Sequence, residues 1–139
     1  MAQYITGDEL AAIIKSDQVP GKDYLVVDVR DDDYAGGNIV KGQNWPSQDF
    51  YGKVGRLVGE TKDVKTVVFH CALSQVRGPK MARIYGETRD RLQAAGADSA
   101  HQVLVLQGGF TQFQAKFKDD PKLVENWDKS VWEGFEDWS

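Results

Sequence analysis

Apolar residues in this chain gather in short runs, and helical patterns separate these runs. The valine-rich runs at 24–29, 65–69 and 102–106 predict buried strands, and Ile39-Val40 predicts a brief one. Helices are predicted at four places: after the Thr6 and Glu9 capping box, in part of 47–58, from Pro79 to about Ala95 before Gly96, and from Gly108-Gly109 through Phe117. Alternating strands and helices predict an α/β fold, with a parallel central sheet and helices on both faces.

Length and composition are typical of one folded domain. The chain has 139 residues, 41% of them hydrophobic, and no repeat or linker divides it, so we expect residues 1–139 to form a single domain. A net charge of −4 argues against a nucleic-acid surface, and no apolar stretch has the length of a membrane span. One cysteine forms no disulfide within the chain, and the amino end lacks a signal-peptide pattern. We therefore expect a cytoplasmic protein, with the nucleus as a further compartment, and no bound metal or cofactor.

Cys71, the single cysteine, is the strongest candidate for chemistry. It lies between the predicted strand at 65–69 and the predicted helix that begins at Pro79. Unpaired backbone N–H groups and the helix dipole at such a position stabilise a thiolate and bind tetrahedral anions. Arg77, at the end of the loop, supplies a planar fork of donors for two anion oxygens. Ligands of open parallel sheets bind beyond the carboxyl ends of the strands, where Cys71 falls.

This loop and two other segments resemble a known family. His70-Cys71, five residues and Arg77-Gly78-Pro79, followed by Met81 and Arg83, are similar to the active-site signature of the M-phase inducer (cell-cycle dual-specificity) phosphatases and the related eukaryotic arsenate reductases. Both groups are variants of the rhodanese fold, so the resemblance implies a single rhodanese-like domain. The early and late rhodanese motifs are also matched, by Val27-Asp28-Val29-Arg30 with Gly37-Asn38-Ile39 and Asn44-Trp45-Pro46, and by Leu106-Gln107-Gly108-Gly109-Phe110.

The resemblance implies a cysteine-thiolate enzyme that acts on phosphate-type oxyanions, as a protein-tyrosine-type phosphatase, an arsenate reductase or both. Cys71 would be the nucleophile, Arg77 would bind the anion, and Ser74 would donate its hydroxyl to the sulfur. The substrate-binding loop would consist of Ala72, Leu73, Ser74, Gln75, Val76, Arg77 and Gly78. A reductase would depend on external glutathione or glutaredoxin, because the chain holds no second cysteine.

Residues next to the loop are expected to support it. An adjacent side chain on a strand points to the opposite face, so His70 is predicted to be a structural hydrogen-bonding residue. Asp28 and Arg30 are predicted to form a framework pair, that is, a pair of side chains that supports the loop. Asp31-Asp32-Asp33 is typical of a solvated run with helix-capping capacity.

A phosphatase also needs an acid that protonates the leaving oxygen. Trp45-Pro46 resembles the acid loop of other tyrosine phosphatases, but Ser47 follows where that loop has an aspartate. Asp49 lies nearby in the sequence and is the candidate acid.

Two other functions stay open from the sequence. A thiosulfate sulfurtransferase would carry sulfur on Cys71, although sulfurtransferases resemble this pattern with one residue fewer in the loop. A non-catalytic oxyanion-binding or partner module is the other alternative, and it depends on an apolar face near the carboxyl end of the chain. Separately, the alternative role of Arg77 is an ion pair with an acid at the sheet edge. Near the carboxyl end, a helical face that we expect to pack on the core carries Trp127, Val131, Phe135 and Trp138.

Overall fold

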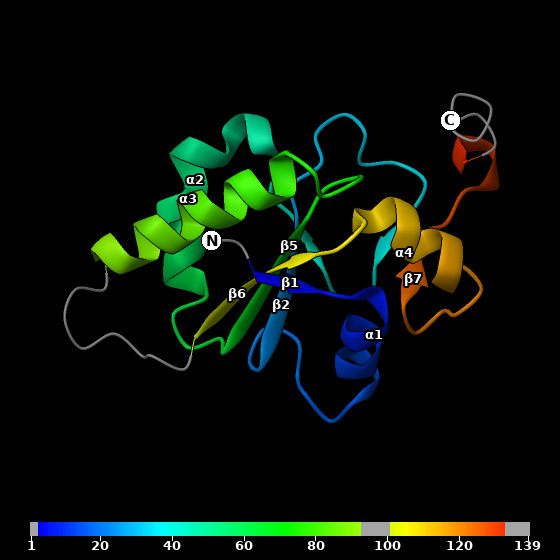
Figure 1. Ribbon diagram of the computed structural model, residues 1–139, viewed down its shortest axis with the longest axis horizontal. Helices are drawn as coiled ribbons and strands as arrows, with labels where there is room; N and C mark the ends of the chain where they lie inside the picture. The colour runs from blue at the N-terminus through cyan, green and yellow to red at the C-terminus, as the bar shows by residue number, and fades with distance from the viewer. Residues whose placement is uncertain (1–2, 93–100, 133–139) are drawn as a thin grey trace.

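In the computed structural model, which describes residues 3–92 and 101–132, five strands form one sheet in which all neighbouring pairs are parallel (Figure 1). The order across the sheet is β1-β6-β5-β2-β4. The strands span Gln3–Ile5 (β1), Tyr24–Asp28 (β2), Gln43–Asn44 (β4), Thr66–His70 (β5) and Gln102–Leu106 (β6). The three inner strands are the three valine-rich runs, as expected for strands covered on both faces.

Helices cover both faces of this sheet (Figure 1). Successive strand residues point to opposite faces, so Val67 packs in a core with Leu57, whereas Val68 packs in a second core with Phe113. The helices span Gly7–Lys15 (α1) and Gly109–Phe117 (α4) on one face, and Phe50–Glu60 (α2) and Arg77–Leu92 (α3) on the other. The predicted α/β fold is confirmed, with one apolar core on each side of the sheet.

The start of α1 follows the predicted capping box. The Glu9 amide donates to Thr6 Oγ1 at 3.1 Å, and the Thr6 amide donates to Glu9 Oε1 at 2.9 Å. These reciprocal bonds satisfy two N–H groups in the region where a helix start lacks partners. The prediction of this helix start is confirmed.

α3 begins at Arg77, two residues before the predicted start. Pro79 is tolerated in the first turn because the N–H that proline lacks would have no partner there. The last two residues of the predicted anion loop, Arg77 and Gly78, therefore belong to the helix. The predicted end of this helix, near Ala95 and Gly96, lies outside the described residues.

Several elements are only two or three residues long. The stretch at 47–58, predicted to be helical in part, consists of a 3-10 turn at Ser47–Asp49 (η1) that leads into α2. The predicted brief strand lies at Asn38–Ile39 (β3) and pairs antiparallel with Val124–Glu125 (β7), a strand that the sequence did not indicate. Asn38 joins the two, since its side-chain amide donates to Glu125 Oε1 at 2.8 Å.

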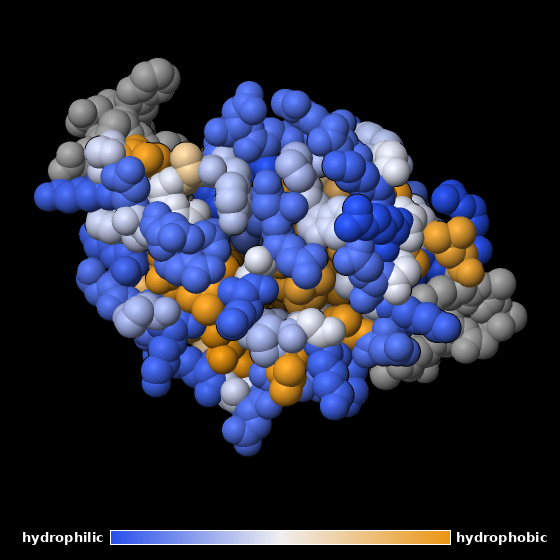
Figure 2. All heavy atoms as spheres, turned by 180° about the vertical axis from the view of Figure 1, so that it is seen from behind, coloured by the Kyte–Doolittle hydropathy of each residue, from blue (hydrophilic) through white to orange (hydrophobic). Residues whose placement is uncertain are grey.

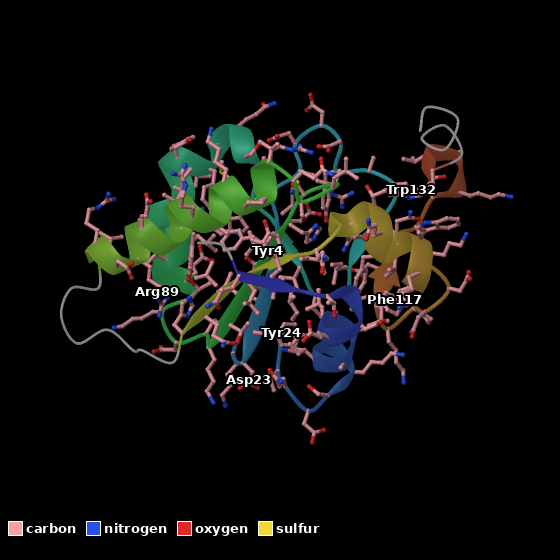
Figure 3. All side chains as sticks on the ribbon, viewed as in Figure 1. Tyr4, Asp23, Tyr24, Arg89, Phe117 and Trp132 are labelled. Carbon is pink, nitrogen blue, oxygen red and sulfur yellow. The ribbon has the colours of Figure 1, made fainter. Side chains whose placement is uncertain are left out.

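The described part of the C-terminal aromatic face is only partly packed. Trp127 precedes the final helical turn and donates from Nε1 to Gln114 Oε1 at 2.9 Å, beside α4. Val131 is 37% exposed, whereas its neighbour Trp132 is buried and donates to the Gly36 carbonyl (Figure 3). The other two members of the predicted face, Phe135 and Trp138, lie outside the described residues.

The outer surface is largely hydrophilic. Figure 2 shows hydrophilic side chains over most of one face, with apolar atoms visible between them. Two exposed apolar side chains, Leu73 and Val76, belong to the loop after β5. None of the described helices has the length and apolar character needed to cross a membrane.

Candidate active site

Cys71 lies directly after the central strand β5 and six residues before the start of α3. Its backbone is tied to the amino end of α4, on the opposite face of the sheet. The Phe110 amide donates to the Cys71 carbonyl at 3.0 Å, and the Thr111 amide donates to the Ala72 carbonyl at 2.9 Å. The loop is therefore held between two helix starts at the carboxyl edge of the sheet, the edge at which the sequence predicts the site.

The Cys71 side chain is buried, and Ser74 is hydrogen-bonded both to its sulfur and to its backbone amide. The Ser74 amide donates to Sγ at 3.1 Å, and the Cys71 amide donates to Ser74 Oγ at 3.4 Å. Ser74 has a φ of 56°, a left-handed conformation that folds the loop back onto the sulfur. The loop backbone therefore directs an amide donor at the sulfur. The donor to the sulfur is thus the Ser74 amide, whereas the sequence-based hypothesis used the Ser74 hydroxyl.

The remaining loop residues surround this bond. Leu73 and Val76 project outward with 42% and 70% exposure, while Gly78 packs close to Ser74. A Cβ at Gly78 would lie 3.3 Å from Ser74 Oγ. Arg77 and Gly78 stand in the first turn of α3, where backbone N–H groups have no partner within the helix. The structure thus places Ala72 to Val76 of the predicted loop between β5 and α3, and its last two residues, Arg77 and Gly78, in the first turn of α3.

Gly109 is a supporting residue whose role the sequence patterns did not indicate. Its φ is +60°, and a Cβ there would lie 2.4 Å from the Ala72 carbonyl oxygen and 2.7 Å from that of Cys71. Only glycine lets the start of α4 approach the loop so closely. The available signal was the glycine pair between a strand and a helix, which indicated the end of a strand and a family motif but not this contact.

Arg77 is bound to carboxylates of the turn after β2. Its Nη1 and Nη2 donate to the two Asp33 oxygens at 2.8 and 2.6 Å, and Nη1 lies 3.4 Å from Asp31 Oδ2. The hydrogen bond from Arg77 lowers the pKa of Asp33, and the same bond raises the pKa of Arg77. Asp33 is solvated as expected, with a side chain that is 43% exposed, but it is also paired with Arg77, whereas the Asp31 side chain is only 13% exposed. The ion pair with an acid, which the sequence left open as the other role of Arg77, is present in the structure.

Asp31 is held on its other side by the segment that leads into α2. Ser47 Oγ donates to Asp31 Oδ2 and the Gln48 amide donates to Oδ1 at 2.9 Å. Burial alone would raise the pKa of Asp31, but these two bonds and Arg77 outweigh it, so its pKa is lowered. The candidate acid Asp49 has a 61% exposed side chain, 4.0 Å from Lys53 one turn along α2.

Asp28 and Arg30 form the buried pair that the sequence predicts. Arg30 Nη2 lies 2.7 Å from Asp28 Oδ2, and the two side chains are 1% and 4% exposed. The same guanidinium donates to the carbonyls of Gly37 at 2.9 Å and Ala35 at 3.3 Å. It also lies 4.5 Å from the centre of the Phe110 ring, at the start of α4. This pair therefore joins the end of β2, the turn that carries Asp31 and Asp33, and the helix behind the cysteine.

His70 contacts both the cysteine loop and the buried pair. Its ring is fully buried against Phe110, with Nδ1 3.1 Å from the Cys71 carbonyl and Nε2 3.8 Å from Asp28 Oδ2. Burial lowers the pKa of His70 despite the nearby carboxylate, so the ring is neutral at neutral pH. A neutral ring that contacts the Cys71 carbonyl and is shielded from solvent fits the predicted structural role.

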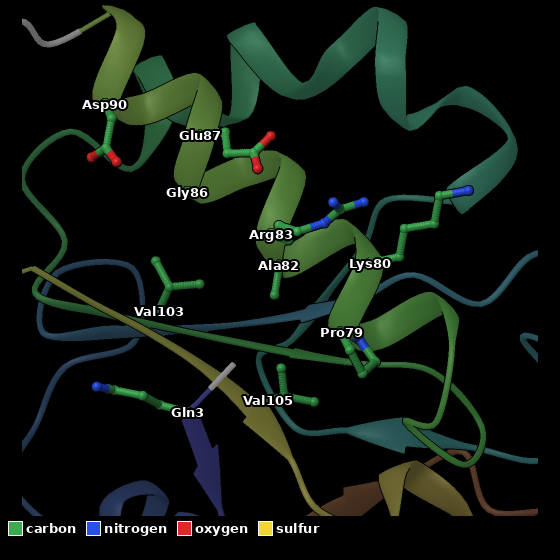
Figure 4. A pocket seen from close by; sticks show the side chains of 10 residues that line it. All are labelled: Gln3, Pro79, Lys80, Ala82, Arg83, Gly86, Glu87, Asp90, Val103 and Val105. Carbon is green, nitrogen blue, oxygen red and sulfur yellow. The ribbon is translucent and has the colours of Figure 1, made fainter. Parts of the chain in front are cut away.

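A separate groove of about 580 Å³ opens between α3 and the strands β1 and β6 (Figure 4). Its wall includes the charged side chains of Lys80, Arg83, Glu87 and Asp90. Pro79 lies at one end of it, but none of residues 71–78 is among its described lining residues. The thiol and this groove are therefore different features. Within the described residues, no cluster of three or more His, Cys, Asp or Glu side chains is arranged to hold a metal ion.

Comparisons with known proteins agree with this fold. The family model of the rhodanese-like domain matches residues 6–116. Over 113 residues the chain is 33% identical to Arsenate reductase 2.2 of Oryza sativa subsp. japonica, and this match covers 80% of this chain and 81% of that protein. Over 124 residues it is 32% identical to Dual specificity phosphatase Cdc25 of Arabidopsis thaliana, covering 88% of this chain and 80% of that protein.

A solved structure shows the same relationship in three dimensions. Ygr203w, described as a yeast protein tyrosine phosphatase of the Rhodanese family, matches with a TM-score of 0.72 and 27% sequence identity. The match covers 94% of this chain and 96% of that one. The resemblance inferred from the sequence motifs is thereby confirmed. The chain belongs to the rhodanese-like domain family, in which its relatives include phosphatases and arsenate reductases.

Proposed function

We propose that this protein is a cysteine-thiolate enzyme that acts on tetrahedral oxyanions, either a phosphomonoester or arsenate. The observation that carries the proposal is the bond from the Ser74 amide to Cys71 Sγ, made at the carboxyl end of β5 and in front of the start of α3. A backbone that folds its amides onto a buried sulfur supports both a thiolate and the binding of an anion beside it.

In the phosphatase reaction, Cys71 Sγ forms a bond to phosphorus while the ester oxygen leaves and takes up a proton. Water then breaks the sulfur–phosphorus bond and releases phosphate. The loop amides and Arg77 would neutralise the charge on the phosphoryl oxygens in both steps. Arg77 suits this task because its fork of donors matches two oxygens at once.

In the reductase reaction, Cys71 Sγ displaces a protonated oxygen of arsenate as water. Reduction of As(V) to As(III) takes two electrons, and two thiols supply them: Cys71 and an external glutathione, which end as a mixed disulfide. A further glutathione or a glutaredoxin would regenerate Cys71, because the chain contains no other cysteine. This cycle requires a reducing compartment, in line with the expected cytoplasmic location.

The acids near the loop favour a substrate with an easy leaving group. Asp31 and Asp33 both have lowered pKa values, so at neutral pH they are ionised and have no proton to donate. Asp49 is solvent-exposed and lies next to Lys53. Arsenate, or a phosphate ester with a good leaving group such as an aryl ester, needs less help from a general acid than an alkyl ester does.

The test compares three reactions side by side: hydrolysis of an aryl phosphate, arsenate reduction with glutathione with and without glutaredoxin, and sulfur transfer from thiosulfate to cyanide. The variants are Cys71→Ser and Arg77→Lys, with Arg91→Lys, an exposed position near the end of the same helix, as the matched arginine control. We expect no turnover from Cys71→Ser, a reduced rate from Arg77→Lys and an unchanged rate from Arg91→Lys.

Three results would count against the proposal. Silence of the wild-type protein in all three assays would leave a non-catalytic module as the better description. Sulfur transfer alone would identify a sulfurtransferase. Equal turnover by Cys71→Ser would exclude the thiolate mechanism.

A further inference from the structure

The Arg77 guanidinium is bound by a carboxylate through the donors that an anion would use. Both terminal nitrogens donate to Asp33, one to each oxygen, and Arg77 makes no hydrogen bond to Cys71 among the described residues. We propose that Asp33 is a positioning residue that holds Arg77 in the resting enzyme, so that an oxyanion must displace the Asp33 carboxylate to be bound. This inference rests on the proposed function, since it concerns the same loop.

The two modes of binding exclude each other at these nitrogens. A carboxylate and a tetrahedral oxyanion each offer two oxygens to the guanidinium fork, and Nη1 and Nη2 serve one such partner at a time. The 2.8 and 2.6 Å bonds to Asp33 must therefore break before the same atoms bind a substrate. The apparent affinity for an oxyanion is then the affinity of a loop in which Arg77 is unpaired, multiplied by the fraction of time for which Arg77 is free.

Hydrogen bonds hold the Asp33 carboxylate and the turn that carries it in place. Asp33 Oδ1 also accepts a bond from the Asp31 amide at 2.9 Å, which holds the side chain in place. The Arg30 guanidinium donates to the Ala35 carbonyl at 3.3 Å and thereby anchors the turn to the buried pair with Asp28. The framework pair thus has a consequence for the site, since it sets the position of the acid that binds Arg77.

Asp33, not Asp31, is the partner that a substrate can displace. The Asp33 side chain is 43% exposed and that of Asp31 is 13% exposed. Asp31 keeps its bonds from Ser47 and the Gln48 amide whether Arg77 stays or moves, and its own distance to Arg77 is longer, at 3.4 Å. A partly solvated ion pair is weak, so we expect its removal to strengthen oxyanion binding by about two- to fivefold.

The experiment measures the dissociation constant of inorganic phosphate by its protection of Cys71 from alkylation by iodoacetamide. Asp33→Asn removes the charge but keeps an oxygen for the Asp31 amide, and Asp32→Asn removes the same charge one residue away without a contact to Arg77. We expect tighter phosphate binding by about two- to fivefold for Asp33→Asn and by less than about 1.5-fold for Asp32→Asn. In turnover, Asp33→Asn should lower KM with little change in kcat, a split that a purely structural role would not produce.

Each outcome decides between the two proposals. Equal tightening by both variants would mean a general charge effect and overturn the role of Asp33, while phosphate binding itself would still support the proposed function. Weaker binding by Asp33→Asn would also overturn it, provided that the melting temperature is unchanged and that Asp33→Ser behaves in the same way. If phosphate protects Cys71 in none of the proteins, the proposed function fails and this inference fails with it.

Discussion

Replacement of Gly109 by alanine tests whether α4 supports the cysteine loop from behind. The new Cβ would lie 2.4 Å from the Ala72 carbonyl oxygen and 2.7 Å from the Cys71 carbonyl oxygen, both backbone atoms that no rotamer change can move. The residue would also keep a φ of +60°, which alanine rarely adopts. The chain has to separate α4 from the loop, and the bonds from the Phe110 and Thr111 amides would then lengthen or break.

The expected loss of stability has two parts. The left-handed conformation costs an alanine about 1–2 kcal/mol. The two amide–carbonyl bonds at 3.0 and 2.9 Å contribute about 0.5–1.5 kcal/mol each, so losing both costs about 1–3 kcal/mol. The free energy of unfolding should therefore fall by about 2–5 kcal/mol, a large part of the about 5–15 kcal/mol typical of a domain.

Gly21→Ala is the matched control for the conformational part. Gly21 has a φ of +85°, and a Cβ added there would have no other atom within 4 Å, so alanine at this position carries only the cost of the left-handed conformation. Urea unfolding followed by circular dichroism should show a loss for Gly109→Ala that exceeds that of Gly21→Ala by about 1–3 kcal/mol. Equal losses would refute the idea that α4 and the loop are in close contact. Gly109→Ala should also slow any turnover that depends on Cys71, and Gly21→Ala should not.

Three further predictions concern the framework and α2. Asp28→Asn leaves the Arg30 charge buried without its partner and should cost about 3–5 kcal/mol in urea unfolding, whereas Asp8→Asn, at an exposed ion pair, should cost at most about 1 kcal/mol; similar losses would contradict the buried-pair argument. Burial lowers the pKa of His70 from 6.5, so as the pH falls the unfolded chain takes up a proton on this ring before the folded chain does. At pH values below 6.5, His70 should therefore decrease the free energy of unfolding by up to about 1.4 kcal/mol for each pH unit. His70→Asn should flatten that slope below pH 6.5, and an unchanged slope would assign it to other groups. Gly55→Ala, in α2 with open space around it, should raise the melting temperature through a gain of about 0.5–1 kcal/mol, and a decrease would point to a contact that the structure lacks.

The elements that sequence patterns predict well are those with strong local signals. The strand at 102–106 and the helix from Gly109 through Phe117 lie where the apolar run and the glycine pair indicate. The short strands β1, β4 and β7 were missed because two or three residues are too few to show a period of two. They form only because neighbouring backbone is already in place to pair with them.

The site was predictable in its components and less so in its contacts. A lone cysteine between a strand and a helix, with an arginine six residues on, indicated a thiolate loop. The structure has Cys71 and Ser74 in contact in the loop after β5, and Arg77 as the first residue of α3. No sequence pattern indicated which partner Arg77 would take, since Asp33 lies 44 residues earlier in the chain. A long side chain selects its partner from whatever the fold brings within reach.

By itself the sequence determined the alternation of buried strands and amphipathic helices, the capped start of α1, and the cysteine loop at the edge of a parallel sheet. These features depend on interactions among residues close in the chain, which a local pattern records. The tertiary structure alone decided that Asp33 binds Arg77 and that Gly109 packs against the loop. It also decided that Arg30 contacts both the turn after β2 and the start of α4. These contacts arise because parallel pairing of β2 with β5 aligns Asp28 with His70, and so places the turn after one strand beside the loop after the other.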